Sequence, residues 1–350
     1  MPVSNPRYLV IRLSSIGDIV HALPAVAALG RSDTRPEIHW AVENRFAMLV
    51  EGNPFVRQVI KLDTLGWRKS LASGNTISDM LRSVEALRSA PYDAAIDFQG
   101  LVKSAVLARI SRSRERIGLG RPWLREPLAA AFYTRRVLPK SRKHIIEINL
   151  ALVESLGARD ANWEFPLPSS EKDATAVRQQ LNKLGVTEYI IVNPGGGWKA
   201  KRWSPENYAN IISRLAGRLT LDILLTGSES EQPLIQEILA RAGTPRAKPF
   251  ASTLTEFIVL ARDARLLIGG DTGPLHLAAA VRTPIVAIFD ASDLLNTPER
   301  NGPFCPADII LCGSSGSNNA NRPKNLTYLE GVSVESVFDA ALKRLAGANG

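Results

Sequence analysis

The chain has 350 residues, which is too long for one hydrophobic core and suits two domains of roughly 100–200 residues each. Its 45% apolar and 22% charged residues are typical of a soluble globular protein, and no stretch reaches the roughly 20 apolar residues that a membrane-spanning helix needs. The net charge of +9 favours an anionic partner, which could be nucleic acid, a membrane surface or an acidic small molecule.

The N-terminal segment lacks the basic and apolar regions of a signal peptide, so we expect the protein to stay in the cytoplasm. The only two cysteines are Cys305 and Cys312, and no histidine or further cysteine stands beside them at metal-binding spacing. This pattern supports neither a disulfide framework nor a zinc site.

The first half of the chain alternates short apolar runs with stretches of helical periodicity. The predicted strands are residues 8–13, 38–42, 56–62 and 94–98, and the predicted helices are residues 19–29 and 77–88. Pro24 lies within the first of these helices and should start or kink it. The alternation favours a doubly wound α/β fold with a parallel sheet.

Two turns of this half should meet at the carboxyl edge of the sheet. Asp18 follows the first strand, and residues 99–104 (QGLVKS) follow the fourth. Asp18 could act as a general base toward a hydroxyl, but from spacing alone a helix cap is the safer interpretation. The first turn has a single glycine and no P-loop follows, which disfavours dehydrogenase and P-loop functions. His21 and His276 are better explained as structural histidines.

The segment from residue 109 to residue 143 is strongly basic. Its basic residues are Arg109, Arg112, Arg114, Arg116, Arg121, Arg125, Arg135, Arg136, Lys140, Arg142 and Lys143, against only Glu115 and Glu126. A solvated helix face normally mixes charges of both signs. We therefore predict that this segment is the docking surface for an anionic partner.

Prolines and serines interrupt the periodicity near residues 162–187, where we place the domain boundary. The second half repeats the βα alternation, and residues 290–325 have the composition of a long loop. The predicted domains are residues 1–168 and 169–330, followed by a C-terminal helix within residues 331–350 that packs back across both. The predicted strands are residues 189–192, 221–225, 266–268 and 285–289, and the predicted helices are residues 171–184 and 337–345.

Two turns of the second half are suited to bind phosphate. Residues 195–197 are glycines followed by Lys201, and residues 269–274 (GGDTGP) lead from a strand into an alanine-rich helix with Pro274 at its start. Backbone N–H groups in such turns, and a helix N-terminus, attract anions. Two neighbouring sites suit a diphosphate, although the second could be an ordinary βα turn. Glu229 is placed like a ribose-binding acid, but from the spacing alone a helix cap is the better-supported interpretation.

Four segments in this order resemble the ADP-heptose:lipopolysaccharide heptosyltransferases of glycosyltransferase family 9. They read VIRLSSIGDIVHALPAV, DFQGLVKSA, REPLAAAFY and GGDTGPLHLAAA. The similarity is greatest to the members that transfer the first heptose to Kdo in the inner core. The resemblance implies a GT-B fold, in which two Rossmann-like domains face a central cleft. The acceptor would bind to the N-terminal domain and ADP-heptose to the C-terminal one.

The resemblance also implies an inverting reaction without metal ion or cofactor, in keeping with the lack of an Asp-x-Asp motif. Asp18 matches the proposed catalytic base, and Lys201 matches the lysine near the diphosphate. The implied donor-binding residues are Gly196, Gly197, Lys201, Glu229, Ser252, Asp271, Thr272 and Gly273. The implied acceptor-binding residues, which would meet Kdo carboxylates, are Lys103, Arg121 and Arg125.

The implied acceptor is an anionic lipid-linked Kdo at the inner face of the inner membrane, with no nucleic-acid partner. After Phe289 the sequence departs from the family's Gly-Pro-Thr-Asp-like loop and reads DASD, which leaves the donor sugar open. Another nucleotide sugar or another core-oligosaccharide acceptor therefore stays an alternative. A nucleic-acid-binding protein is a more distant alternative, motivated by the sequence pI of about 9.7.

Overall fold

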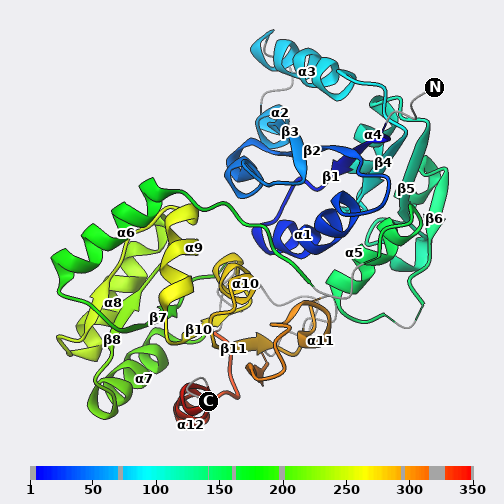
Figure 1. Cartoon of the computed structure of the whole chain (residues 1–350). Helices are drawn as coiled ribbons and strands as arrows, with labels where there is room; N and C mark the ends of the chain where they lie inside the picture. The colour runs from blue at the N-terminus through cyan, green and yellow to red at the C-terminus, as the bar shows by residue number, and fades with distance from the viewer. Residues whose placement is uncertain are drawn as a thin grey trace. The chain divides into compact units, whose positions relative to one another are not determined.

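The computed structural model describes residues 5–69, 74–140, 142–159, 163–196, 202–292, 296–314 and 328–347. The chain divides into two compact units, Met1–Pro168 and Ser169–Gly350. Each unit has one parallel sheet with helices on both faces (Figure 1). The doubly wound α/β fold predicted from the alternation of strands and helices is confirmed in both halves.

The sheet of the first unit has the order β3-β2-β1-β4-β5-β6. Its strands are β1 (Arg7–Ile11), β2 (Glu37–Glu43), β3 (Val56–Leu62), β4 (Ala94–Asp97), β5 (Glu115–Leu119) and β6 (Arg135–Val137). The helices are α1 (Ile16–Gly30), α2 (Thr64–Lys69), α3 (Gly74–Leu87), α4 (Val102–Ile110) and α5 (Ile145–Glu154), with short 3₁₀ helices η1 (Asn44–Leu49), η2 (Arg121–Trp123) and η3 (Pro127–Phe132).

Strand β1 is the centre of this unit because it pairs with both β2 and β4. Leu9, Val10 and Ile11 are fully buried, as expected for a strand covered on both faces. Chain order reverses between β1 and β4, and in such sheets ligands bind at the carboxyl ends of these two strands. The loops that follow β1 and β4 are therefore the positions where function is expected.

The second unit repeats this order as β12-β11-β10-β7-β8-β9, so its reversal lies between β7 and β10. Its strands are β7 (Tyr189–Asn193), β8 (Asp222–Leu225), β9 (Ala247–Pro249), β10 (Leu267–Gly270), β11 (Ile285–Asp290) and β12 (Ile309–Gly313). The helices are α6 (Glu171–Leu184), α7 (Pro205–Arg218), α8 (Gln232–Ala242), α9 (Leu254–Asp263), α10 (Gly273–Ala280), α11 (Pro298–Asn301) and α12 (Val334–Ala346), with the 3₁₀ helix η5 (Glu229–Glu231) before α8.

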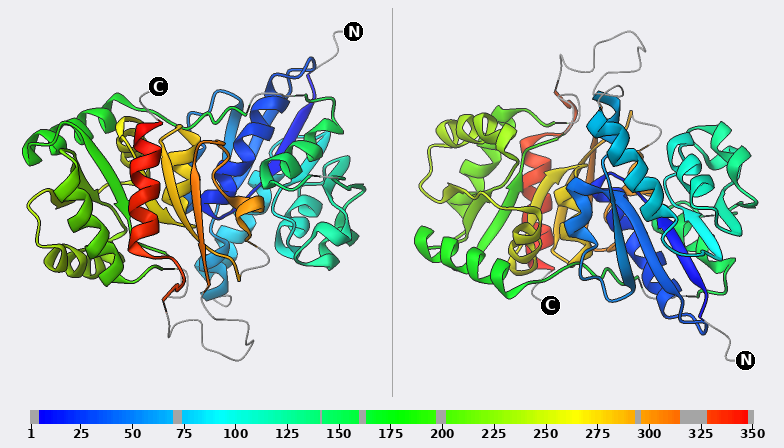
Figure 2. Two further views of the ribbon diagram at one scale, coloured as in Figure 1. Left: turned by 90° about the horizontal axis from the view of Figure 1, so that it is seen from below. Right: turned by 90° about the horizontal axis from the view of Figure 1, so that it is seen from above.

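Two expectations about local structure need correction. Helix α1 begins at Ile16 and contains Pro24, so the proline does not start the helix. The segment 290–325 is not all loop, because its described part contains α11 and the edge strand β12. Helix α12 belongs to the second unit, where Figure 2 shows it in red along the strands. Its apolar side chains, including Val337 and Ala341, are buried in the core of that unit.

Within the described ranges, none of the helices combines the length and the hydrophobicity needed to cross a bilayer. Cys305 and Cys312 are both free and exposed. Cys312 lies on β12, the strand that the loop-like composition concealed.

Candidate active site

Asp18 lies in the first turn of α1, directly after the carboxyl end of β1. Its Oδ2 accepts hydrogen bonds from the backbone N–H of Ser15 (3.0 Å) and from the Ser15 hydroxyl (2.9 Å). Ser15 is the N-cap residue of α1 and Asp18 is the N3 residue of its capping box, so Asp18 supports the helix start without being the N-cap that the spacing suggested. The side chain remains 40% exposed, so a carboxylate edge is also open to a ligand. Asp18 is therefore both a capping residue and a candidate base.

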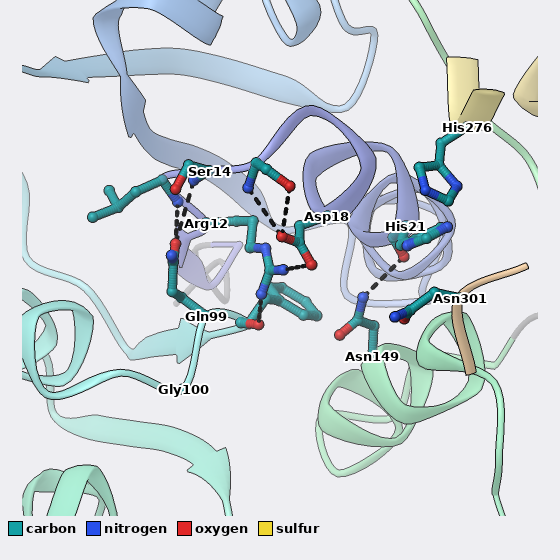
Figure 3. Close-up of polar contacts among 12 residues, drawn as sticks. Arg12, Ser14, Asp18, His21, Gln99, Gly100, Asn149, His276 and Asn301 are labelled. Atoms are coloured by element: carbon teal, nitrogen blue, oxygen red, sulfur yellow. Dashed lines mark hydrogen bonds and ion pairs between the residues drawn. The ribbon is translucent and has the colours of Figure 1, made fainter. Parts of the chain in front are cut away.

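Arg12 holds the other oxygen of this carboxylate (Figure 3). Its guanidinium pairs with Asp18 Oδ1 and also donates to the carbonyl oxygen of Phe98, at the end of β4. Arg12 is buried, and its Nε has no hydrogen-bond partner among the described residues. One side chain thus links the two strand ends at the reversal point and orients Asp18. Arg12 was not among the predicted site residues, although an arginine inside the apolar run of residues 8–13 indicates a buried pair.

Asp97 organises the turn from β4 to α4. It is fully buried and accepts hydrogen bonds from Tyr133 OH (2.7 Å), Ser104 Oγ (2.8 Å), and the N–H groups of Gln99 (2.8 Å) and Gly100 (3.1 Å). Burial raises the pKa of Asp97, and these hydrogen bonds act in the opposite direction. Gly100 has a φ of +68°, which favours glycine. The network fixes the turn beside Arg12.

Gln99 ties this turn to the end of β1. Its Oε1 accepts from the backbone N–H groups of Leu13 (2.8 Å) and Ser14 (3.3 Å). Figure 3 shows this bridge beside the pair of Arg12 and Asp18. The position of the candidate base therefore depends on two loops that are fastened to each other.

Replacing Tyr133 with phenylalanine should destabilise the first unit by about 1–3 kcal/mol, because a buried carboxylate loses a donor. The loss of that hydrogen bond also lets the pKa of Asp97 rise further, so the deficit should be larger at neutral than at acidic pH. Urea unfolding at several pH values measures both effects. Tyr8→Phe is the matched control, since the Tyr8 hydroxyl makes no hydrogen bond within the described ranges. Equal losses in the two variants would contradict the role of Tyr133.

The predicted acceptor residues lie at the same carboxyl edge of the first sheet. Lys103 is half-buried in the first turn of α4, and Arg121 and Arg125 are exposed in the segment after β5. Glu126 accepts from the backbone N–H of Val102 (2.7 Å) and so fastens that segment to the start of α4. The structure thus groups the three basic residues with the turn that contacts Arg12.

Asn193 connects three strand ends in the second unit. Its Nδ2 donates to the carbonyl oxygen of Thr226 (2.9 Å), after β8, and its Oδ1 accepts from the Thr272 hydroxyl (3.3 Å), after β10. Thr272 is the N-cap residue of α10, and its hydroxyl is used in this link instead of capping the first turn. A Cβ on Gly269 would lie 3.0 Å from the carbonyl oxygen of Asn193, so glycine allows this close approach.

Gly196 lies in the turn that follows β7, and its backbone N–H is hydrogen-bonded to an acidic side chain. That N–H donates to Glu231 Oε1 (2.9 Å), and its carbonyl accepts from Arg202 Nε (2.8 Å). A Cβ on Gly195 would overlap the Glu231 carboxylate, which explains a glycine there. In this structure the N–H of Gly196 is thus paired with a carboxylate side chain, and diphosphate binding by this turn stays a prediction. A phosphate at this N–H requires Glu231 to move aside.

Glu231, and not Glu229, is the acid that reaches this turn. Glu229 is exposed at the start of η5, two residues earlier. Glu231 also accepts from the backbone N–H of Ser228 (2.8 Å), and the Ser-x-x-Glu spacing of this capping box was the signal available in the sequence. Ser252 is half-buried in the loop after β9.

The turn at residues 271–273 lies where the opening of α10 was predicted. Asp271 is largely buried, and its Oδ1 is 3.2 Å from His276 Nε2 on the same helix. Gly273 is the first residue of α10, with Pro274 following. The predicted donor residues Gly197 and Lys201 lie outside the described residues.

Comparison with known proteins identifies the family of this chain. A model of glycosyltransferase family 9 (heptosyltransferase) matches residues 80–328. Lipopolysaccharide heptosyltransferase 1 of Pseudomonas aeruginosa is 31% identical over 339 residues, which cover 97% of this chain and 92% of that protein.

Two solved structures of the Escherichia coli heptosyltransferase WaaC are also similar. The one with ADP has a TM-score of 0.77 at 25% identity, covering 97% of this chain and 99% of that chain. The one with ADP-2-deoxy-2-fluoro heptose has a TM-score of 0.72 at 25% identity, covering 98% and 100%. The chain therefore belongs to glycosyltransferase family 9, as a glycosyltransferase whose two Rossmann-like units form a GT-B fold.

Proposed function

We propose that this protein transfers heptose from ADP-heptose to the Kdo residue of the lipopolysaccharide inner core. The observation that carries the proposal is the match to lipopolysaccharide heptosyltransferase 1 over almost the whole of both chains. The solved relatives that bind ADP and an ADP-heptose analogue support the choice of donor. The partly exposed carboxylate of Asp18 at the reversal point of the first sheet supports the choice of base.

In the proposed reaction, Asp18 removes the proton from an acceptor hydroxyl as that oxygen attacks the anomeric carbon. The bond from this carbon to the diphosphate breaks on the opposite face, so the configuration inverts and ADP leaves. Arg12 keeps one carboxylate oxygen of Asp18 fixed, and the capping contact with Ser15 fixes the other. The base is thus held in place before the substrate arrives.

On the donor side, the proposal assigns the developing charge of the diphosphate to Lys201 and to the N-terminus of α10 at Asp271–Gly273. Backbone N–H groups and a lysine can stabilise this charge without a metal ion, and we propose that none is needed. Gly196, Gly197, Glu229 and Ser252 complete the proposed donor site. Since Glu231 already contacts Gly196, we add it as a second candidate for the ribose hydroxyls.

On the acceptor side, Lys103, Arg121 and Arg125 are proposed to bind the carboxylates of Kdo, because guanidinium and ammonium groups pair well with carboxylates. The acceptor is lipid-linked in this proposal. The protein would then act at the inner face of the inner membrane, as a peripheral protein without a nucleic-acid partner.

Thermal-shift titration with ADP, UDP, GDP and CMP tests the donor assignment. ADP should raise the melting temperature most, because only ligands that bind the folded state stabilise it. Lys201→Ala should weaken the ADP shift, whereas Lys183→Ala, an exposed lysine on α6, should not. Addition of EDTA should leave ADP binding and transfer unchanged. A larger shift with UDP, GDP or CMP would reject ADP-heptose as the donor.

A further inference from the structure

The segment between β5 and α5 exposes two leucines beside four basic residues. Leu128, in η3, is 74% exposed, and Leu138, after β6, is 53% exposed. We define the basic-apolar patch as these two leucines together with Arg121, Arg125, Lys140 and Lys143, all four of which are exposed. Leucines of this exposure next to clustered positive charge are typical of surfaces that bind membranes.

The members of the patch belong to one packed segment. The Leu138 side chain lies directly over Gly120, at the point where a Cβ would be, and Gly120 N donates to the carbonyl oxygen of Val137 (2.9 Å). Arg121 follows Gly120, and its helix η2 packs against η3, which carries Leu128. The carboxyl ends of β5 and β6 therefore bring the leucines and the basic side chains to the same edge of the sheet.

Ion pairs separate the patch from the rest of the basic run. Three of the other arginines form ion pairs within the first unit: Arg114 pairs with Asp93, Arg135 with Glu115 and Arg142 with Glu154.

The four basic members of the patch form no ion pair within the described part of the chain. Glu126, the only acidic residue between positions 121 and 143, uses its carboxylate at the start of α4. The patch thus keeps a net positive charge, with the carboxylates of Glu126 and Glu147 beside it, the latter 3.3 Å from the backbone nitrogen of Lys143.

Helix α3 offers the useful contrast. It also exposes two apolar side chains, Ile77 (51%) and Leu81 (65%). Acidic Asp79 and Glu85 lie on the same helix, and Asp79 pairs with Arg82. Exposed apolar area alone does not distinguish the two surfaces, but charge does, because only the patch is positive.

We propose that the basic-apolar patch docks this protein on the surface of a bilayer that contains anionic phospholipid. The leucines enter the interface between headgroups and acyl chains, and Lys140 and Lys143 contact lipid phosphates, while Arg121 and Arg125 face the acceptor carboxylates assigned to them above. This inference rests on the proposed function in one respect, the lipid-linked acceptor. Leu124, next to the patch, packs against Gly100 in the turn that positions Arg12, so a docked patch places the acceptor edge of the sheet near the lipid.

Co-sedimentation with vesicles of phosphatidylcholine, with and without phosphatidylglycerol, tests the proposal. The full chain should sediment with the anionic vesicles and far less with the neutral ones. Lys140→Gln/Lys143→Gln should lower the partition coefficient by about 5-fold for each lysine. Leu128→Ser/Leu138→Ser should lower it as well, and Ile77→Ser/Leu81→Ser is the matched control that should bind like the unmodified chain. If the leucine variant does not fold, vesicle binding of the lysine variant still tests the proposal.

Vesicle binding that is unchanged in the patch variants, or lost only in the α3 control, would overturn the proposal. So would binding of an RNA oligonucleotide that is as tight as vesicle binding and depends on the lysines but not on the leucines. Neither lysine nor leucine pair belongs to the proposed catalytic machinery, so ADP binding and transfer to an acyl-free acceptor should be unaffected. If the unmodified chain shows no heptose transfer but its vesicle binding still depends on the patch residues, the proposed function is rejected and membrane docking by the patch is supported.

Discussion

Asp18→Asn should lower the turnover number by about 10²–10⁴-fold, because an amide cannot accept the proton of the attacking hydroxyl. ADP affinity should not change, since the proposed donor site lies in the other unit. Steady-state kinetics of ADP release, combined with an ADP thermal shift, measures the two quantities separately. The effect should appear in kcat and in kcat/KM equally, as expected for an interaction made only in the transition state.

The dual role of Asp18 calls for a control that disturbs the helix and keeps the carboxylate. Ser15→Ala removes the hydroxyl that donates to Asp18 Oδ2 and should reduce stability modestly while preserving turnover. If Ser15→Ala were as inactive as Asp18→Asn, capping of α1 would explain the loss. Near-normal turnover of Asp18→Asn would reject the assignment of the base outright.

Arg344→Met should destabilise the second unit by about 3–5 kcal/mol, because it leaves a buried carboxylate without its partner. Asp308 Oδ1 accepts from Arg344 Nε (3.0 Å) and from the backbone N–H of Ile285 (3.0 Å), and so joins α12 to the start of β11. Both side chains of the pair are at least nine-tenths buried. Urea unfolding followed by circular dichroism measures the loss.

The deficit of this variant should depend on pH. Burial raises the pKa of Asp308, and Arg344 is the main group that opposes the rise, so the pKa climbs further in Arg344→Met. A carboxyl group with a raised folded-state pKa takes up its proton at higher pH than in the unfolded chain. The deficit should therefore be largest near neutral pH and should shrink as the pH falls toward the ordinary value of 3.8.

Two further variants separate the pair from general effects on α12. Asp308→Asn/Arg344→Met should recover part of the lost stability, because no charge remains buried. Arg214→Met breaks the exposed ion pair between Arg214 of α7 and Glu335 of α12, and it should have little effect on stability. A loss of similar size in Arg214→Met, or a deficit that does not change with pH, would contradict the role of the buried pair.

The central strands were predictable because they are buried on both faces and so consist of continuous apolar runs. The runs at β1, β7, β10 and β11 meet this condition, and their positions agree with the sequence to within a few residues. Edge strands bury less side-chain surface than central strands, so they need fewer apolar residues. The sequence pattern missed the edge strands β6 and β9, although it found the edge strand β3, and it also missed the interior strand β5, whose first two residues are charged. Strand β12 was hidden in a segment rich in serine, asparagine and proline.

The polar contacts were harder to predict because they join residues distant in sequence. The sequence identified Asp18 at a strand end, but its partner Arg12 looked like part of an apolar run. In the sequence, Asp97 looked like an ordinary residue at the end of a strand. Only the fold brings the Tyr133 hydroxyl to its carboxylate. The sequence singled out Glu229 after β8 and did not consider Glu231, which reaches the Gly196 turn because of its side-chain direction, a property that spacing does not contain.

The most direct test of the account is transfer from ADP-heptose to a Kdo-bearing lipid A by the purified protein, measured by ADP release and by NMR of the product. We expect ADP to appear only when the acceptor is present, and the anomeric configuration of the transferred heptose to be opposite to that of the donor. Acceptor-independent ADP release, transfer with retained configuration, or no transfer from ADP-heptose by a folded, ADP-binding protein would contradict it.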